Sequence, residues 1–162
     1  MISDRLRYAP VELENLDAFR SLLQDDHVRR YLLDGNLFPR DWTEERIRES
    51  QKLFERRGVG LWLATDIANQ LVGFCGFLEF PSIHAEPQLV YAMLERFTGK
   101  GYATEMARAS IAYARGRAGL AEVFAGVDAV NVASCRILEK LGFERVATRQ
   151  GSFGDMYLLR LA

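Results

Sequence analysis

The residues that point most directly to chemistry lie between positions 96 and 105, in the run RFTGKGYATE. Gly99, Gly101 and Ala103 alternate there, at the junction between an apolar stretch typical of a strand and a stretch typical of a helix. Small side chains let an anion approach the free N–H groups at a helix start, where the helix dipole also favours negative charge. Lys100 adds a positive charge beside them. The run predicts a loop that binds a phosphate-like group, and the alternative is a tight turn without a ligand.

Two well-known phosphate loops do not fit the same residues. A Walker A loop needs a glycine five positions before Gly99, where Leu94 stands, and Ser or Thr where Gly101 stands. A dinucleotide-binding fingerprint needs a third glycine where Thr104 stands, and it should follow the first strand of a βαβ unit. ATP and NAD are therefore poor candidates for the ligand.

A second run, between positions 128 and 143, has two polar residues at the start of a predicted helix. Asn131 suits the N-cap position, which explains it without any ligand. Ser134 stands at the third helical position, where Glu or Gln is the usual partner of the cap, so capping explains it less well. Leu138 and Leu141 would face the core, and Gly142 would end the helix in the left-handed conformation.

The elements that must position these two runs follow from hydrophobic periodicity and turn residues. The first part of the chain predicts a short strand over 6–11, a helix capped by Asn15, and a second helix over 26–33. Thr43 is expected to open a third helix that Gly58 ends, with Trp42 and Ile47 packed against each other across its start.

The rest of the chain alternates between extended and helical patterns. Strands are expected over 61–65, 71–80, 89–94, 122–128, 144–148 and 155–161, and helices over 101–116 and 131–141. Three strands follow one another before the first crossover, so the fold class is α/β of the α+β type. We expect a mixed, mostly antiparallel central sheet of about seven strands flanked by helices.

Length and composition exclude several classes of protein. The 162 residues predict a single domain over 1–162. The net charge is −1 with no strongly basic segment, which disfavours nucleic acid as a partner. Two cysteines and two histidines are too few for a Cys/His zinc site, so no metal is expected. We find neither a signal peptide nor an apolar run of membrane-spanning length, so we expect a cytoplasmic protein without a membrane partner.

Together, the order of elements, the run TGKGYATE and the later run NVASCRILEKLGF resemble the GNAT superfamily of acyl-CoA-dependent N-acyltransferases. More narrowly, they resemble the RimJ/RimL-like branch, which acetylates the N-termini of ribosomal proteins. The resemblance covers nearly the whole chain, from Arg5 to Leu158. It implies a GNAT fold and acetyl-CoA as co-substrate.

The resemblance implies two stretches that bind acyl-CoA. The family's pyrophosphate loop falls on residues whose backbone amides would hold the phosphates: Thr98, Gly99, Lys100, Gly101, Tyr102, Ala103 and Thr104. Thr98 stands where Gln or Arg is common, and a register shifted by two residues would place Arg96 there instead. The end of the preceding strand would splay from its neighbour and offer free amides to the pantetheine arm and the thioester: Tyr91, Ala92, Met93 and Leu94.

The resemblance also implies catalytic roles. Asn131 would contact the pantetheine arm, and the Ser134 hydroxyl would protonate the CoA sulfur as it leaves. Other branches place a Tyr where Leu138 stands, which favours Ser134 for this role. The branch commonly carries a Glu early in the fourth strand, and Gln88 stands there. A glutamine cannot accept a proton at neutral pH, so Gln88 would orient the amine or a water molecule.

Four other residues are candidates for a general base, and none is favoured over a structural role: His27, His84, Glu86 and Asp128. A covalent route through Cys135 is disfavoured, because a cysteine in a buried helix usually acts as a small hydrophobic residue. Amine attack on a thioester needs little help from a base once the neutral amine is aligned.

The leading prediction is an acetyl-CoA-dependent N-acetyltransferase in which a primary amine attacks directly in a ternary complex. The acceptor would be a protein N-terminus, a small polyamine or amino acid, or an antibiotic. The alternative is a non-catalytic acyl-CoA-binding or regulatory domain on the same scaffold, which Gln88 keeps open. Acyl-CoA and the amine are the expected partners, and the protein would be a monomer or a homodimer.

Overall fold

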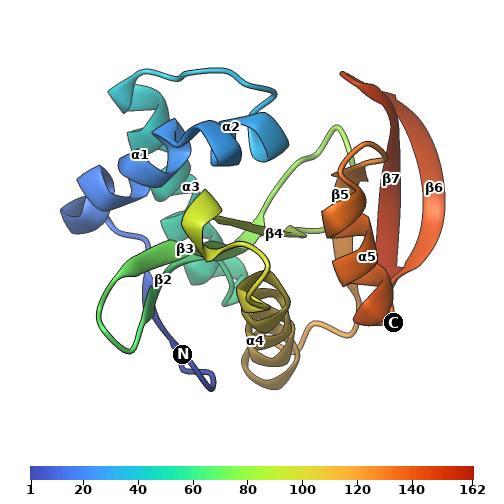
Figure 1. The fold of residues 1–162 in the computed structure, drawn as a ribbon. Helices are drawn as coiled ribbons and strands as arrows, with labels where there is room; N and C mark the ends of the chain where they lie inside the picture. The colour runs from blue at the N-terminus through green and yellow to red at the C-terminus, as the bar shows by residue number, and fades with distance from the viewer.

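A seven-stranded sheet in the order β1-β2-β3-β4-β5-β7-β6 runs through the computed structural model, which describes residues 1–162 (Figure 1). The strands are β1 (Leu6–Pro10), β2 (Leu61–Asp66), β3 (Leu71–Leu78), β4 (Gln88–Met93), β5 (Val123–Asp128), β6 (Glu144–Gly151) and β7 (Gly154–Leu161). All neighbours are antiparallel except β4 and β5, which are parallel. The predicted mixed, mostly antiparallel sheet is confirmed.

Helices cover both faces of this sheet (Figure 1). They are α1 (Leu16–Gln24), α2 (Asp26–Leu32), α3 (Arg40–Arg57), α4 (Tyr102–Arg117) and α5 (Val132–Lys140), with short 3₁₀ turns at Leu13–Asn15 and Glu95–Phe97. The order of strands and helices is the predicted one. Along the chain, α4 comes after β4 and α5 comes after β5, so the first turn of each helix follows the end of a central strand.

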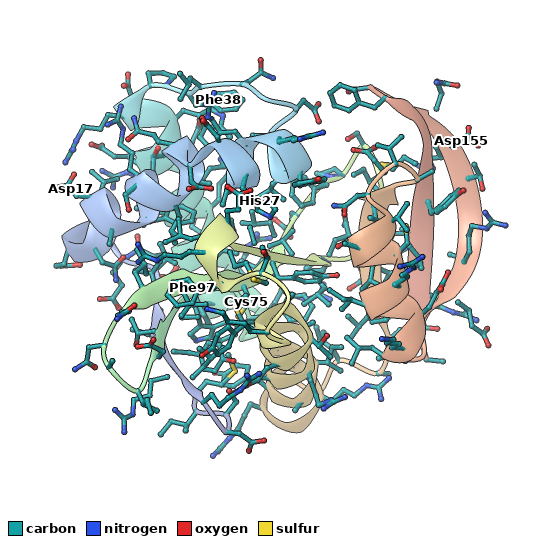
Figure 2. The ribbon with its side chains drawn as sticks, viewed as in Figure 1. Asp17, His27, Phe38, Cys75, Phe97 and Asp155 are labelled. Carbon is teal, nitrogen blue, oxygen red and sulfur yellow. The ribbon has the colours of Figure 1, made fainter.

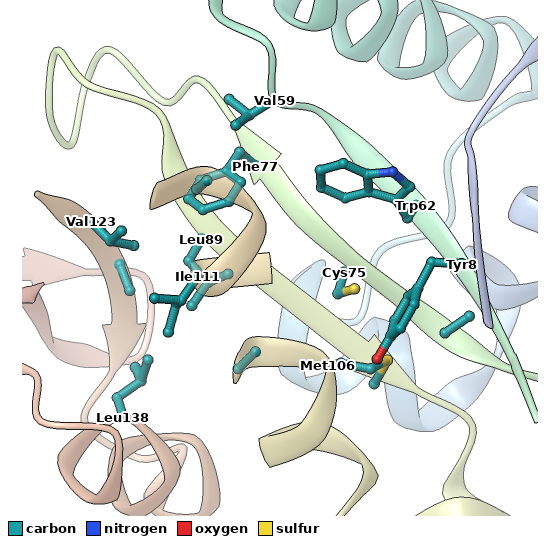
Figure 3. Packing of buried hydrophobic residues seen from close by; sticks show 14 of the residues in the cluster. Tyr8, Val59, Trp62, Cys75, Phe77, Leu89, Met106, Ile111, Val123 and Leu138 are labelled. Atoms are coloured by element: carbon teal, nitrogen blue, oxygen red, sulfur yellow. The ribbon is translucent and has the colours of Figure 1, made fainter. Parts of the chain in front are cut away.

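Alternation along the strands divides the core between the two faces. In β4, Val90 joins the cluster under α1 and α2, whereas Leu89 joins the cluster under α4 and α5. Figure 3 shows the second cluster, in which Met106 and Ile111 of α4 pack over the sheet. Because side chains of a strand point alternately to opposite faces, both faces of the sheet are held by apolar burial and the central strands are almost entirely covered.

The parallel pair β4–β5 is held at one point only. Gln88 pairs with Phe124, and no residue after Gln88 in β4 has a partner in β5. The two strands therefore separate toward the end of β4, which opens the middle of the sheet. The starts of α4 and α5 both lead from the strands that border this opening.

The start of the third helix differs from the prediction. The third helix begins at Arg40 rather than Thr43, because the N–H of Thr43 already bonds to the carbonyl of Pro39. A proline suits a helix start since its missing N–H is not needed there. Trp42 does not pack across the start but stacks on Phe38, with ring centroids 4.1 Å apart. The expected packing of Trp42 against Ile47 across that start is therefore wrong.

Asn15 occupies the N-cap position of the first helix, as predicted, but without the side-chain hydrogen bond expected of a cap. The side chain of Asn15 makes no cap bond to α1. Its Oδ1 accepts the N–H of Glu12 at 2.8 Å, and its Nδ2 donates to the carbonyl of Pro10 at 3.1 Å. An amide side chain can bond to the turn before it as readily as to the helix after it, and here the 3₁₀ turn takes it.

Candidate active site

The loop before α4 presents free backbone donors. Gly99 and Gly101 have φ of +72° and +82°, a left-handed conformation that side chains other than hydrogen disfavour. The N–H groups of residues 99–104 make no hydrogen bond within the protein, and no side chain caps α4. A Cβ added at Gly99 would meet no atom within 4 Å. The loop therefore offers an open row of donors at the positive end of a 16-residue helix.

The N-terminal segment fixes the orientation of this loop. Arg5 donates from Nη1 to the carbonyl of Lys100 at 2.8 Å, and its guanidinium lies over the ring of Tyr102, 4.4 Å from the centroid. In a trans peptide the C=O and the following N–H point in opposite directions. By holding the Lys100 carbonyl, Arg5 turns the N–H of Gly101 the other way.

Glu105 anchors Arg5 in turn. It accepts the Arg5 N–H and Nε–H, both at 2.8 Å, and the Ser3 hydroxyl at 2.7 Å. Burial alone would raise the pKa of Glu105, but these hydrogen bonds and the charge of Arg5 outweigh burial and hold the pKa below its usual value. The sequence prediction gave no role to Arg5 or Glu105. Their partners lie about a hundred residues away, and no local pattern indicates such a pair.

A cavity of about 490 Å³ opens onto the loop. It is lined by α2, the end of β4, the loop and one face of α5. Most of the residues predicted to bind acyl-CoA line it together: Tyr91, Ala92, Met93, Thr98, Gly99, Gly101, Tyr102, Ala103, Thr104, Asn131 and Ser134. The local motifs and the strand end thus meet in one place.

Two of the predicted residues do not line the cavity. The N–H of Leu94 is not free as predicted, because it donates to the carbonyl of Val72 at 3.0 Å. The Lys100 side chain lies near the ring of Phe97, with Nζ 5.5 Å from its centroid, while its carbonyl is held by Arg5. Lys100 therefore contributes backbone to the loop rather than a side chain to the cavity.

The cavity wall also contains basic residues that the sequence prediction missed. Arg136 and Lys140 of α5 both line it, and His27 of α2, which the sequence offers as a candidate base, lines it from the other side (Figure 2). Residues four apart lie on the same face of a helix, so the spacing of Arg136 and Lys140 was a usable signal. Their positive charges suit an anionic ligand.

A pair of hydroxyl groups lies where β4 meets α5. The Tyr91 Oη is 2.8 Å from the Ser134 Oγ, which joins residues 43 positions apart. Burial raises the pKa of Tyr91 to about 12, although the hydrogen bond with Ser134 opposes this. The phenol therefore stays protonated at neutral pH and can donate to Ser134. Asn131 caps the helix, as predicted, by accepting the Ser134 N–H at 3.2 Å.

A smaller hollow of about 180 Å³ adjoins the cavity and shares five wall residues with it: Tyr31, Leu32, Tyr91, Asn131 and Ser134. Gln88 lines this hollow and not the larger cavity. Its side chain is buried, with Nε2 donating to the carbonyls of His84 and Glu86. Its Oε1 is buried with no hydrogen-bond partner.

The other candidates for a base are distributed differently. Glu86 forms an ion pair with Arg57, and His84 stacks on Phe124 with ring centroids 3.9 Å apart. Neither lines the cavity or the hollow, which removes both from the reacting region. Asp128 lines the smaller hollow. Burial, and then the charge of Asp34, raise the pKa of Asp128 above its usual value.

Known proteins share this architecture. A model of the acetyltransferase (GNAT) domain matches residues 5–144, which is most of the chain. The chain belongs to the GNAT acetyltransferase family. Among curated proteins, the uncharacterized protein YkkB of Bacillus subtilis (strain 168) is 29% identical over 145 residues, covering 88% of this GNAT chain and 83% of YkkB.

Solved structures show the same GNAT fold. A GNAT-family acetyltransferase from Bordetella pertussis has a TM-score of 0.86 at 21% identity, covering 100% of this chain and 98% of that one. RimL, a ribosomal alpha-N-protein acetyltransferase solved with coenzyme A, has a TM-score of 0.82 at 15% identity, covering 99% of this chain and 96% of that one. The predicted GNAT fold is confirmed, and the likeness to RimL is consistent with the RimJ/RimL-like branch.

The GNAT chain shows neither a cluster of metal-ligating side chains nor a helix suited to span a membrane. No group of three or more His, Cys, Asp or Glu side chains is arranged to hold a metal ion. None of the helices combines the length and the apolar character that crossing a bilayer requires.

Proposed function

We propose that this GNAT protein transfers an acetyl group from acetyl-CoA to a primary amine, which attacks directly in a ternary complex. One observation carries the proposal: the free donors of residues 99–104 open into the same cavity as the Tyr91–Ser134 hydroxyl pair. An anion-binding loop and a proton donor in one cavity suit a substrate that has a phosphate group at one end and a leaving group at the other.

The chain's own residues fit acetyl-CoA. The N–H groups of residues 99–104 would hold the pyrophosphate, and the charges of Arg136 and Lys140 would add to the attraction. The end of β4, which has no partner in β5 after Gln88, would bond the pantetheine arm, with Asn131 on the opposite wall. The coenzyme A bound in the RimL structure supports this assignment by analogy of fold.

Acetyl-CoA supplies an acetyl group that is activated as a thioester. In the reaction the amine nitrogen bonds to the carbonyl carbon, the carbon–sulfur bond breaks, and the amine loses a proton to water. Ser134 gives its hydroxyl proton to the departing sulfur and regains one from Tyr91, which water then reprotonates. Backbone N–H groups at the end of β4 would stabilise the negative charge that develops on the carbonyl oxygen. Gln88 would orient the amine or a water molecule.

The alternative of a non-catalytic acyl-CoA-binding domain derives from Gln88, which stands where a base is common in the branch. The arrangement of the site argues for catalysis, since a domain that only binds acyl-CoA has no use for a hydroxyl pair on the cavity wall. Alignment of a neutral amine and stabilisation of the oxyanion can provide most of the rate without a strong base.

The test is to incubate the protein with acetyl-CoA and a panel of amines and N-terminal peptides, and to follow thiol release. With no strong base, the rising limb of kcat/KM against pH should follow deprotonation of the acceptor and move when amines of different pKa are compared. A rising limb that stays at one pH for all amines would instead indicate an enzymic base, and Asp128→Asn would then be the first variant to measure. Acetyl-CoA binding without thiol release from any amine would favour the non-catalytic alternative.

A further inference from the structure

The smaller hollow has mostly apolar walls contributed by elements far apart in the chain. Side chains from α2, the β3–β4 loop, β5 and β7 form these walls: Leu32, Phe80, Ile83, Val127 and Met156. Figure 1 shows α2 and the β6–β7 hairpin on the two sides of the opening between β4 and β5. A hollow of about 180 Å³ between them has room for a compact group only.

The only charged side chain that lines the hollow is negative. Asp128 is its only carboxylate, and no Lys, Arg or His lines it. The Asp128 carboxylate makes no ion pair and no side-chain hydrogen bond within the protein, and the charge that raises its pKa, Asp34, is also negative. A cation entering the hollow would be attracted, whereas an anion would be repelled from the same place.

Gln88 adds a second unsatisfied acceptor. Gln88 lines the hollow, and its Nε2 donates to two backbone carbonyls, whereas its Oε1 is buried with no donor. Buried polar atoms of native proteins nearly always have a partner, and an orphaned one calls for an explanation. An amide oxygen accepts and never donates, so the missing partner must carry an N–H or O–H group.

The hairpin makes room for the Asp128 carboxylate. A Cβ added at Gly151, at the end of β6, would lie 3.0 Å from the Asp128 Oδ1 and 3.1 Å from the Cβ of Met156. Any side chain at Gly151 would therefore press on the carboxylate. The glycine keeps Asp128 at the rim of the hollow, where it can meet a ligand.

From these observations we infer that the smaller hollow is the acceptor site, and that it selects a compact amine bearing a second nitrogen cation and no carboxylate. The inference rests on the proposed function. The reacting nitrogen would lie at the wall shared with the larger cavity, beside Tyr91 and Ser134. The second nitrogen would lie between Asp128 and the Oε1 of Gln88, where both acceptors are satisfied by one ammonium group.

Three acceptors with the same number of carbon atoms test the charge preference: 1,3-diaminopropane, propylamine and β-alanine, which end in a cation, a methyl group and a carboxylate. Rates are compared at equal concentrations of the neutral reacting amine. We expect kcat/KM for the diamine to exceed that for propylamine about tenfold, and that for β-alanine about hundredfold, because each step changes one charge beside a partly buried carboxylate.

Two variants connect the preference to the residues. Asp128→Asn should reduce the diamine-to-propylamine ratio to within about threefold, since it removes the attracting charge. Asp155→Asn is the matched control, because Asp155 is an exposed carboxylate on β7 that lines neither space, and it should keep the wild-type ratio. Gln88→Met removes the acceptor at similar size and should raise KM for the diamine about fivefold with little change in kcat.

The outcomes separate this inference from the proposed function. If acetyl-CoA binds and no amine is acetylated, the proposed function fails. If amines are acetylated but β-alanine reacts as well as the diamine, or Asp128→Asn keeps the ratio, the proposed function stands and the acceptor inference is overturned. Should Gln88→Met fail to fold, the Asp128→Asn ratio still decides, because Asp128 is only partly buried.

Discussion

The two halves of the site use different groups of the chain: backbone N–H groups in one half and side chains in the other. The acyl-CoA half depends on backbone N–H groups from one continuous stretch, residues 99–104, and two glycines there need left-handed backbone. The acceptor half depends on side chains from α2, the β3–β4 loop, β4, β5, α5 and β7. Every sequence has backbone donors, so the first half can be kept while other residues change. The second half changes with each wall residue, and substrate choice belongs to it.

The largest effect is expected from a side chain placed in the backbone half. In Gly101→Val, the branched side chain would lie among the N–H groups of residues 99–104. Valine also disfavours a positive φ, and this position has a φ of +82°. A Cβ there would already touch the Arg5 guanidinium, with Nη2 at 3.4 Å. Losing one or two charge-assisted bonds of about 1.5–3 kcal/mol each predicts a fall in acetyl-CoA affinity of about 100-fold, measured by calorimetry.

Gly116→Ala is the matched control for this variant. Gly116 lies in α4, the helix that Gly101 precedes as N-cap residue, has no positive φ, and an added Cβ would meet nothing within 4 Å. It should bind acetyl-CoA like the wild type, and it should be more stable by about 0.5–1 kcal/mol. If Gly101→Val remains folded and binds acetyl-CoA normally, the pyrophosphate does not lie on this loop.

The contrast between the halves also explains what could be predicted from the sequence. Gly99, Gly101, Asn131 and Ser134 were recognisable because each acts within its own turn, where spacing along the chain equals proximity in space. The Tyr91–Ser134 pair was not recognisable as a pair, because strand pairing and the packing of α5 bring its members together. The acceptor hollow forms only when six parts of the chain come together, so no pattern within a single segment predicts it.

The fold shows the same rule on a larger scale. Strand alternation and helical periodicity predicted the order of elements, because burial on one or two faces leaves that pattern in the sequence. Thr43 was wrongly expected to begin α3, since it has the right type for a cap but is buried three residues inside the helix. Local preference for a cap was overruled by Pro39 and by packing.

A second, smaller effect is expected at the boundary between the halves. Ser134→Ala should lower kcat about thirtyfold with little change in acetyl-CoA affinity, near the low end of general acid catalysis because a thiolate leaves readily. Tyr91→Phe should lower kcat less, since Ser134 can then be reprotonated by water. The double variant should be no slower than Ser134→Ala, because both hydroxyl groups act on one proton path.

Single-turnover measurement is the right check, because it isolates the chemical step from product release. Wild-type kcat in Ser134→Ala, under conditions where chemistry limits the rate, would remove Ser134 from the reaction. Multiplicative losses in the double variant would show that the two hydroxyl groups act separately.

The smallest effect is expected from a change in Glu105, which supports the backbone half through Arg5. Glu105→Gln keeps one acceptor for Arg5 and Ser3 but loses the charge, so Arg5 should hold the Lys100 carbonyl less firmly. We expect acetyl-CoA affinity to fall about threefold and stability at neutral pH to fall by about 1–2 kcal/mol, the lower end being favoured because Arg5 is 46% exposed. Glu79→Gln is the control, since it breaks an ion pair with Arg56, neither residue lines the cavity, and acetyl-CoA affinity should be unchanged.

The pH dependence of the stability loss tests the same contact independently. The pKa of Glu105 is lower in the folded protein than its ordinary value of 4.5, so the folded state binds the proton less readily than the unfolded state. The contribution of Glu105 is therefore complete above the unfolded pKa of 4.5 and is lost as the pH falls through the lower folded pKa. Denaturant unfolding gives the difference in free energy of unfolding between wild type and Glu105→Gln. This difference should be constant at neutral pH and should decrease progressively below about pH 4.5. A difference in free energy of unfolding that stays the same at acidic pH would mean that the variant acts through packing. The backbone half would then be supported by the shape of the N-terminal segment rather than by its charge.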